Sequence, residues 1–240
     1  MIETARLPPI YSLVPLGIDA DPLERARAMA KSGADPATIL CADRDDVLDC
    51  ALILQPDAAL QVSRLVIYVG MLGLGDALGS VVPAGIDVTY RWPNRIDANM
   101  GAVGRLGLAV PAQTTADAVP PWMVLHALVA ISTRQSNGPG GVDFETTLAE
   151  EGAVEVTAPQ LLESFSRHFL TWMGRWQDDG FAPVRAMWLH HATEHGEELR
   201  VPAGGGQMQG KFREIDDDGA LLLDDGGTTR RIPLDSVLDA

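Results

Sequence analysis

Apolar residues recur along the chain with two spacings, one typical of helices and one of strands. The longest apolar stretch, residues 60–78, has helical periodicity and predicts a buried helix. Its glycines Gly70, Gly73 and Gly75 fall inside that helix instead of between a strand and a helix start. They therefore favour close helix packing over a phosphate-binding loop. Other helices, each with a proline near its start, are predicted at residues 22–31, 158–177 and 182–190.

Short apolar runs bounded by turn residues predict strands. Residues 7–17 are rich in proline and are expected at a sheet edge, because proline cannot donate a hydrogen bond to a central ladder. Residues 97–101 are expected to turn between two of the strands, and residues 136–141 to form a glycine-rich loop. The remaining strands are predicted at residues 38–42, 51–54, 88–92, 106–110 and 123–131.

The pattern changes near residues 195–207, where a run of glycines precedes a strand-like tail. Tight turns are predicted in the tail at residues 217–219 and 225–227. These features predict two domains, residues 1–196 and residues 197–240. The second would be a small barrel that packs on the first, since a piece of about 40 residues is marginally stable alone.

Composition narrows the class of protein. The 240 residues carry 33 acidic and 18 basic side chains, a formal charge of −15. This balance argues against nucleic acid or an anionic membrane as a partner. Two cysteines are too few for a disulfide framework, and the first residues lack the basic and apolar regions of a signal peptide. We expect a cytoplasmic protein.

The candidate chemistry centres on residues 90–95, which read Tyr-Arg-Trp-Pro-Asn-Arg and follow a predicted strand. Pro93 fixes its own φ and restricts the residue before it, so it holds Trp92 and Asn94 rigidly beside each other. Two interpretations stay open. Trp92 is a core plug and Asn94 caps a loop, or both form the wall of a ligand pocket.

Residues 91–94, Arg-Trp-Pro-Asn, resemble the Lys-Trp-Pro-Asn-Asp signature of biotin protein ligases and, more loosely, of lipoate ligases. Residues 172–183 with Trp188 resemble the late helix pair of that family, and residues 210–223 resemble its C-terminal barrel. The resemblance implies an α+β fold. A mixed β-sheet with helices on one face, as in the biotin/lipoate protein ligase catalytic domain, would be followed by a small SH3-like β-barrel.

A ligase of this family adenylates biotin or a lipoyl-type acid with ATP and passes the acyl group to a lysine of a carrier domain. That chemistry needs cations and backbone donors around phosphate. The family supplies donors through a glycine- and arginine-rich loop. The matching residues 41–50 contain no glycine, one arginine (Arg44) and four aspartates, which repel a triphosphate. Arg44 would be the surviving arginine of the loop, or would form an ion pair with Asp45 or Asp46.

Three other signature positions differ from the family. Arg95 stands where the family usually has an aspartate, and Arg105 is the only cation near the position of its lysine. Residues 125–131 lack the glycines and the asparagine of a later strand end. The expectation for the fold survives these differences, because fold and site are separable, whereas the expectation of ligase activity is weakened.

Three hypotheses follow. The first is a divergent protein that binds a biotin- or lipoyl-type acid, or a biotinyl- or lipoyl-carrier domain, with most ATP and adenylate elements lost. The alternative is an active ligase or acyltransferase, and the third is a structural subunit. ATP with Mg and biotin or lipoate are implied by the resemblance alone, no metal site is predicted, and an edge strand would allow a homodimer. The candidate ligand-binding residues are Arg44, Arg91, Trp92, Asn94, Arg95 and Arg105.

Two weaker candidates have plain alternatives. His191, Glu194 and His195 match the His-x-x-Glu-His spacing of a zinc peptidase, but Gly196 places them at a helix end. The related octanoyltransferases use a cysteine, which Cys41 or Cys50 would supply. Their acidic flank would raise a thiol pKa, so buried structural cysteines are the favoured interpretation.

Overall fold

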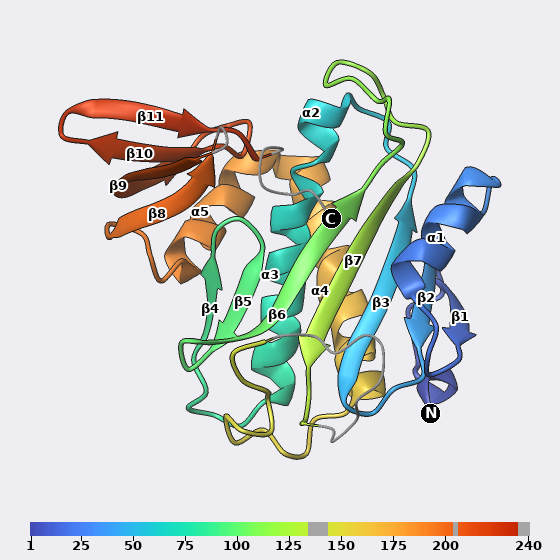
Figure 1. Cartoon of the computed structure of the whole chain (residues 1–240). Coiled ribbons are helices and arrows are strands. Elements are labelled where there is room, and N and C mark those ends of the chain that lie inside the picture. Colours follow the sequence, from blue (N-terminus) through green and yellow to red (C-terminus); the bar gives the residue numbers. More distant parts are fainter. Residues whose placement is uncertain (134–143, 204–205, 235–240) are drawn as a thin grey trace.

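A seven-stranded sheet forms the centre of the molecule (Figure 1). The computed structural model describes residues 1–133, 144–203 and 206–234, and the predicted loop at residues 136–141 lies outside them. The strands run in the order β1-β2-β3-β7-β6-β5-β4, with β1 and β2 parallel and the other neighbours antiparallel. Their bounds are β1 Ser12–Leu16, β2 Thr38–Ala42, β3 Val47–Leu54, β4 Val88–Arg91, β5 Arg95–Ala98, β6 Gly101–Ala109 and β7 Met123–Ala130.

Helices cover both faces of this sheet. The long helices α3 (Val66–Val81) and α4 (Ala158–Asp179) pack on one face, and α1 (Pro22–Lys31) packs on the other against β2, β3 and β7 (Figure 1). The expectation of helices on one face alone was therefore wrong. The small side chains of Ala26 and Ala30 let α1 approach the sheet closely. We call the face opposite α3 and α4, where α1 packs against β2, β3 and β7, the open face.

The predicted helix at residues 60–78 is divided into α2 (Leu60–Ser63) and α3. A Cβ added at Gly73 would lie 2.8 Å from the Cα of Phe169 on α4, so the close-packing interpretation of the glycines is confirmed. Leu60–Val81 is long and apolar enough to cross a membrane, but 78% of its most apolar window is buried inside the protein. This burial is that of a core helix.

The segment after β4 forms two hairpins where one was predicted. Residues 92–94 make the first turn, and β5 returns along β4 before a second turn at Asn99 and Met100, which have φ values of 48° and 72°. The prediction missed β5 because four residues with turn residues on both sides carry too short an alternation to be recognised.

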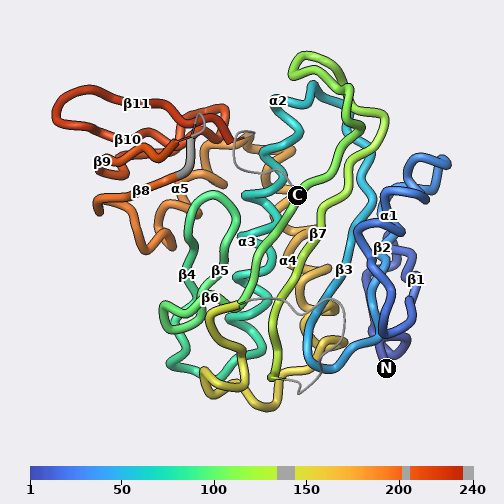
Figure 2. Tube along the Cα trace, in the orientation of Figure 1, coloured from blue at the N-terminus to red at the C-terminus, as the bar shows by residue number. Residues whose placement is uncertain are grey.

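The C-terminal part is a four-stranded antiparallel sheet of order β11-β10-β9-β8. Within the described residues this sheet is open, so the predicted closed barrel is not seen there. Its buried face, which includes Phe212 and Leu223, joins the main core beside Trp188 of α5 (Phe181–His191) (Figure 2). The strands are β8 Glu198–Ala203, β9 Gly206–Ile215, β10 Leu221–Asp225 and β11 Thr228–Ile232.

We predict that Gly73→Ala lowers the free energy of unfolding by about 1–3 kcal/mol, because the added methyl meets backbone atoms of Phe169 that cannot rotate away. Gly79→Ala is the matched control in the same helix, since nothing lies within 4 Å of its added Cβ. There alanine should leave stability unchanged or raise it by up to about 1 kcal/mol. Urea denaturation measures both, and equal stabilities would contradict the packing argument.

Candidate functional site

The two distinctive side chains of residues 90–95 make structural contacts. Trp92 is 6% exposed and its Nε1 donates a hydrogen bond to the hydroxyl of Tyr68 at 2.9 Å. Asn94 Nδ2 donates to the carbonyl of Leu106 at 2.6 Å, and the Leu106 amide donates back to the Asn94 carbonyl at 3.0 Å. The ring therefore packs in the core, and the amide fastens the β4–β5 turn to β6.

The Tyr68 hydroxyl extends this contact into the C-terminal sheet. It donates to the carbonyl of Gly219, in the turn between β9 and β10, at 2.6 Å. Burial raises the pKa of Tyr68, so its hydroxyl stays protonated and able to donate. Gly219 has a φ of 78°, and an added Cβ would lie 2.7 Å from a Leu65 methyl. The Trp92–Tyr68–Gly219 chain thus joins the hairpin, α3 and the C-terminal sheet.

Three of the candidate residues lie side by side on the open face. The strand register pairs Arg91 with Arg95 and Arg95 with Arg105 across β4, β5 and β6. Each is adjacent in sequence to a residue of the core under α3 and α4, and neighbours in a strand point to opposite faces. We call these three residues the arginine row.

Two carboxylates neutralise one end of the arginine row. Arg91 lies 2.7 Å from Asp97 and 3.0 Å from Glu145, and Arg95 lies 3.6 Å from Glu145. Asp97 is 1% exposed, and burial raises its pKa although Arg91 opposes the rise. Hydrogen bonds from Arg91 and from the Ala102 amide lower the pKa of the Glu145 carboxyl. The guanidinium group of Arg91 is therefore held between the carboxylates of Asp97 and Glu145.

Arg105 is different, because its side chain is exposed and forms no hydrogen bond or ion pair within the described residues. It stands directly opposite Arg95, and like charges in such a pair repel each other. A bound anion would relieve this repulsion. At the pair Arg95–Arg105 the open face therefore carries positive charge. Carboxylates of the described residues balance that charge only in part.

The same row continues across β7 to β3, where the sequence interpretation named no site. The register pairs Arg105 with Leu128 and Leu128 with Asp49, and His126 Nε2 lies 2.8 Å from Asp49 Oδ1. The signal was a single histidine in the apolar run at residues 123–131. It could have been noticed, but its partner could not, because nothing local to β3 indicates the pairing of β3 with β7.

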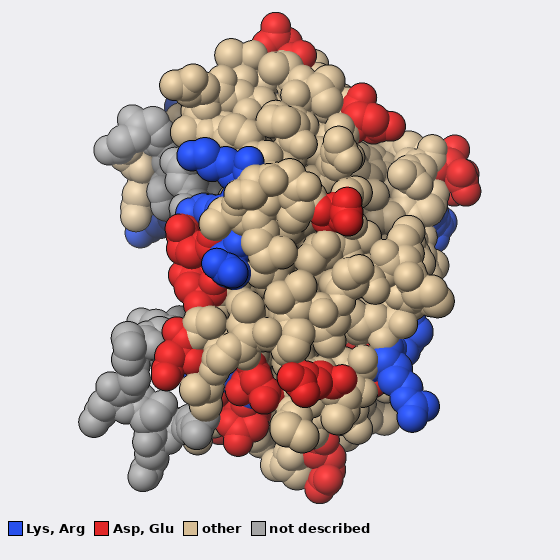
Figure 3. Space-filling view, turned by 90° about the vertical axis from the view of Figure 1, so that its right-hand side faces the viewer, with Lys and Arg blue, Asp and Glu red and all other residues tan. Residues whose placement is uncertain are grey.

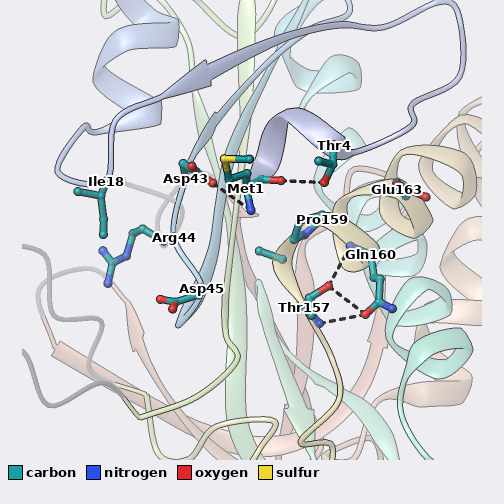
Figure 4. A pocket seen from close by; sticks show the side chains of 11 residues that line it. Met1, Thr4, Ile18, Asp43, Arg44, Asp45, Thr157, Pro159, Gln160 and Glu163 are labelled. Carbon is teal, nitrogen blue, oxygen red and sulfur yellow. Dashed lines mark hydrogen bonds and ion pairs between the residues drawn. The ribbon is translucent and has the colours of Figure 1, made fainter.

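Arg44 lies off the arginine row. It belongs to the four-residue connection 43–46 between β2 and β3, where it donates to both carboxylate oxygens of Asp46 at 3.0 and 2.8 Å. That hydrogen bonding raises its pKa, and the predicted ion pair with Asp46 is confirmed. The connection borders a cavity of about 560 Å³ between the N-terminal turn and the start of α4 (Figure 4). Its lining is Met1, Thr4, Ile18, Asp43, Arg44, Asp45, Thr157, Ala158, Pro159, Gln160 and Glu163.

The His-x-x-Glu-His segment does not form one helical face. Helix α5 ends at His191, and Glu194 and His195 lie in the turn beyond it, where His195 Nε2 donates to the Arg213 carbonyl at 2.9 Å. Among the described residues no three His, Cys, Asp or Glu side chains are grouped to hold a metal. Burial raises the pKa of Glu194, and nearby Arg91 opposes the rise.

Cys41 and Cys50 face each other on β2 and β3, on the side packed under α3 and α4. Both are free and buried, and burial raises the pKa of each thiol. They are core residues, as the sequence interpretation favoured.

Together the mixed sheet, its helices and the C-terminal sheet have the fold of biotin protein ligases. The chain belongs to the biotin/lipoate A/B protein ligase family, whose model matches residues 7–190, and the model of the biotin protein ligase C terminal domain matches residues 195–234.

Of three similar proteins, two are named as biotin ligases and one is of unknown function. A crystal structure of a biotin protein ligase-like protein of unknown function from Silicibacter sp. TM1040 has a TM-score of 0.89 and 31% identity, covering 99% of this chain and all of that one. A biotin–[acetyl-CoA-carboxylase] ligase from Paracoccus denitrificans is 27% identical over 176 residues, 72% of this chain and 71% of the ligase. The biotin protein ligase of Aquifex aeolicus, in complex with biotin and ATP, shares the fold with a TM-score of 0.73 at 18% identity, covering 94% of this chain and 96% of that one.

We predict that Tyr68→Phe lowers the free energy of unfolding by about 1–3 kcal/mol, because it leaves the Trp92 Nε1 and the Gly219 carbonyl buried without their partner. Tyr11→Phe is the control, since the Tyr11 hydroxyl makes no side-chain hydrogen bond within the described residues. Urea denaturation of both variants measures the two losses in free energy of unfolding. Equal losses would show that the chain of hydrogen bonds contributes nothing specific.

We also predict that neither thiol reacts with a maleimide at neutral pH in the native protein, because Cys41 and Cys50 are buried and their pKa values are raised. Mass spectrometry should detect two labels after denaturation, matching the two cysteines of the sequence. Rapid labelling of either native thiol would instead restore the nucleophile hypothesis.

Proposed function

We propose that this protein binds a free carboxylic acid of the biotin or lipoyl type and does not adenylate it. The ligand's carboxylate lies at Arg95 and Arg105. The observation that carries the proposal is their direct opposition on the open face, with Arg105 making no ion pair within the described residues. Two guanidinium groups can hold one carboxylate through parallel hydrogen bonds.

The other candidates support this pair in different ways. Arg91, held by Asp97 and Glu145, fixes the strand next to Arg95. Trp92 and Asn94 set the conformation of the turn that precedes Arg95, the first residue of β5. Glu145 competes with the ligand for Arg95, yet it is half exposed and reaches Arg95 at 3.6 Å, a weak contact that a ligand carboxylate can displace.

The connection between β2 and β3 is poorly suited to adenylation. Its four residues are too few to wrap a triphosphate, and the amides of Asp43 and Arg44 already donate to the carbonyls of Leu16 and Ala42. The only guanidinium there is held by Asp46. Carboxylates in this position repel phosphate unless a magnesium ion lies between them, so we expect ATP without magnesium not to bind.

The alternative is an active ligase or acyltransferase that attaches such an acid to a carrier lysine. It is favoured by the likeness to the Paracoccus denitrificans ligase, whose name gives acetyl-CoA carboxylase as its substrate. In that case Arg105 would replace the family's lysine as the cation near the acyl phosphate. A cytoplasmic location, a carrier partner and a homodimer through the β1 edge belong to both versions of the proposal.

Pyrophosphate exchange separates the two versions. We expect no exchange of labelled pyrophosphate into ATP with biotin, lipoate or octanoate, because the phosphate cradle is missing. An active biotin protein ligase assayed in parallel serves as the positive control. Exchange above background with any of the acids would overturn the non-adenylating proposal and establish the alternative.

Calorimetry with the same acids tests binding. We predict that Arg105→Ala weakens the binding of octanoate or lipoate about tenfold, the loss expected for one charge-assisted contact of about 1.4 kcal/mol. Arg25→Ala, at an exposed arginine of α1 away from the open face of β5 and β6, should leave affinity unchanged. If none of the acids binds to the unmodified protein, the proposal fails and the structural-subunit hypothesis takes its place.

A further inference from the structure

Three carboxylates lie around the three guanidinium groups of the arginine row. Asp97 and Glu145 lie 2.7 and 3.0 Å from Arg91. Glu194 lies in the turn after α5, where burial raises its pKa and the nearby charges of Arg91 and Arg95 oppose the rise. These six groups carry three positive and three negative formal charges. The row is therefore positive at its Arg105 end, whereas its Arg91 end is surrounded by carboxylates.

Glu145 turns one of its two carboxylate oxygens toward Arg95. Its Oε2 accepts from the Ala102 amide at 3.1 Å and from Arg91 Nη2 at 3.0 Å. Its Oε1 lies 3.3 Å from Arg91 Nη1 and 3.6 Å from Arg95 Nη1. Oε2 is therefore the anchored oxygen, and Oε1 is the oxygen that Arg95 meets.

The backbone holds this carboxylate in position. The Glu145 amide donates to the Ala102 carbonyl at 3.2 Å, and Leu148, three residues further on, is fully buried. Hydrogen bonds from Arg91 and the Ala102 amide lower the pKa of the Glu145 carboxyl, so it is ionised at neutral pH. A fixed negative charge therefore stands beside Arg95.

The groups that a ligand would meet are open to solvent. The side chains of Arg95 and Glu145 are 55% and 51% exposed, and Arg105 is also exposed. Arg95 therefore has room to turn from Glu145 toward Arg105 when an anion binds between the two arginines. In Figure 3 the open face lies along the left margin, where basic and acidic groups are both seen.

The fixed charge of Glu145 limits how much negative charge this site accepts. One negative charge between Arg95 and Arg105 relieves the repulsion of the two arginines. The three arginines already face three carboxylates, so a second negative charge on the ligand gains little attraction and is repelled by Glu145. A carboxylate carries one negative charge, whereas a phosphate ester carries about two above neutral pH.

We infer that Glu145 is a specificity-determining residue, which makes the site selective for singly charged carboxylates over doubly charged phosphates. This inference rests on the proposed anion site at Arg95 and Arg105, and it adds the class of anion that the site excludes. Glu145 acts through its charge and its contact with Arg95, and it does not itself hold the ligand.

Calorimetry with octanoate and octyl phosphate at about pH 8 tests the inference, because the two ligands share a tail and differ in the charge of the head. The unmodified protein should bind octyl phosphate no more tightly than octanoate. Glu145→Gln keeps the length of the side chain and an oxygen for the Ala102 amide, and it should tighten octanoate about fivefold. It should tighten octyl phosphate about 25-fold, because the Coulomb energy scales with the charge of the ligand. Glu155→Gln, the same change at an exposed position ten residues later, should alter neither affinity.

Two results would overturn the inference while leaving the anion site in place. They are tighter binding of octyl phosphate than of octanoate by the unmodified protein, and equal gains for the two ligands in Glu145→Gln. Binding of neither ligand to the unmodified protein would overturn the anion site itself, and the inference with it. Circular dichroism verifies that Glu145→Gln is folded, and the comparison of the two ligands on the unmodified protein does not depend on the variant.

Discussion

The buried hydrogen-bond chain from Trp92 through Tyr68 to Gly219 is the constraint on which the other features depend. Tyr68 is fully buried, and its hydroxyl both accepts from the indole and donates to the glycine carbonyl. In a low-dielectric core each of these groups would be costly to leave unpaired, so the three parts they come from are held in one arrangement. The C-terminal sheet is thereby docked on the helix layer, and the β4–β5 turn is fixed against it.

Strand register places the arginine row next to this fixed turn. With Trp92 directed into the core, its neighbour Arg91 ends β4 on the open face, and Arg95 begins β5 on the same face. Asn94, bonded to Leu106 through its side chain and its carbonyl, sets β5 against β6 so that Arg95 meets Arg105. A slip of one residue would turn these side chains to the opposite face. A register that keeps the core packed therefore also keeps the arginine row on the open face.

The sequence predicted the local parts of this arrangement well. Residues 38–42 form the strand expected of them, and α1 begins at Pro22 with Asp21 accepting from the Glu24 amide, as its capping pattern indicates. These features depend on neighbours in the chain. The short strand β5 was missed although it pairs with its neighbours in the chain, because four residues between two turns show too little alternation. The packing of α1 on the second face and the contact between Asp49 and His126 depend on pairings far apart in sequence, which periodicity does not report.

The candidate residues also divide into those whose contacts are local in sequence and those whose contacts depend on strand pairing. The family signature was read either as a core plug with a loop cap or as a pocket wall, and Trp92 and Asn94 have the contacts of the first kind. Arg95 and Arg105 could be nominated from the sequence as departures from the family pattern, but their opposition could not be foreseen, because it requires the unpredicted β5. Two roles were considered for Arg44, and its two hydrogen bonds to Asp46 are the contacts expected of the second, the ion pair.

This division explains how one chain retains the Trp-Pro-Asn part of the signature while it differs from the family pattern at other signature positions. The residues that match the signature, Trp92 and Asn94, are those whose contacts hold the fold together. Of the positions that differ, Arg44 lies in the connection before β3, and Arg95 and Arg105 lie on the open face of β5 and β6, where a change of side chain leaves the core intact. Charge and shape on that face are therefore free to suit another ligand without disturbing the sheet beneath it. The signature indicates ancestry because it is structural, and the ligand must be deduced from the residues around it.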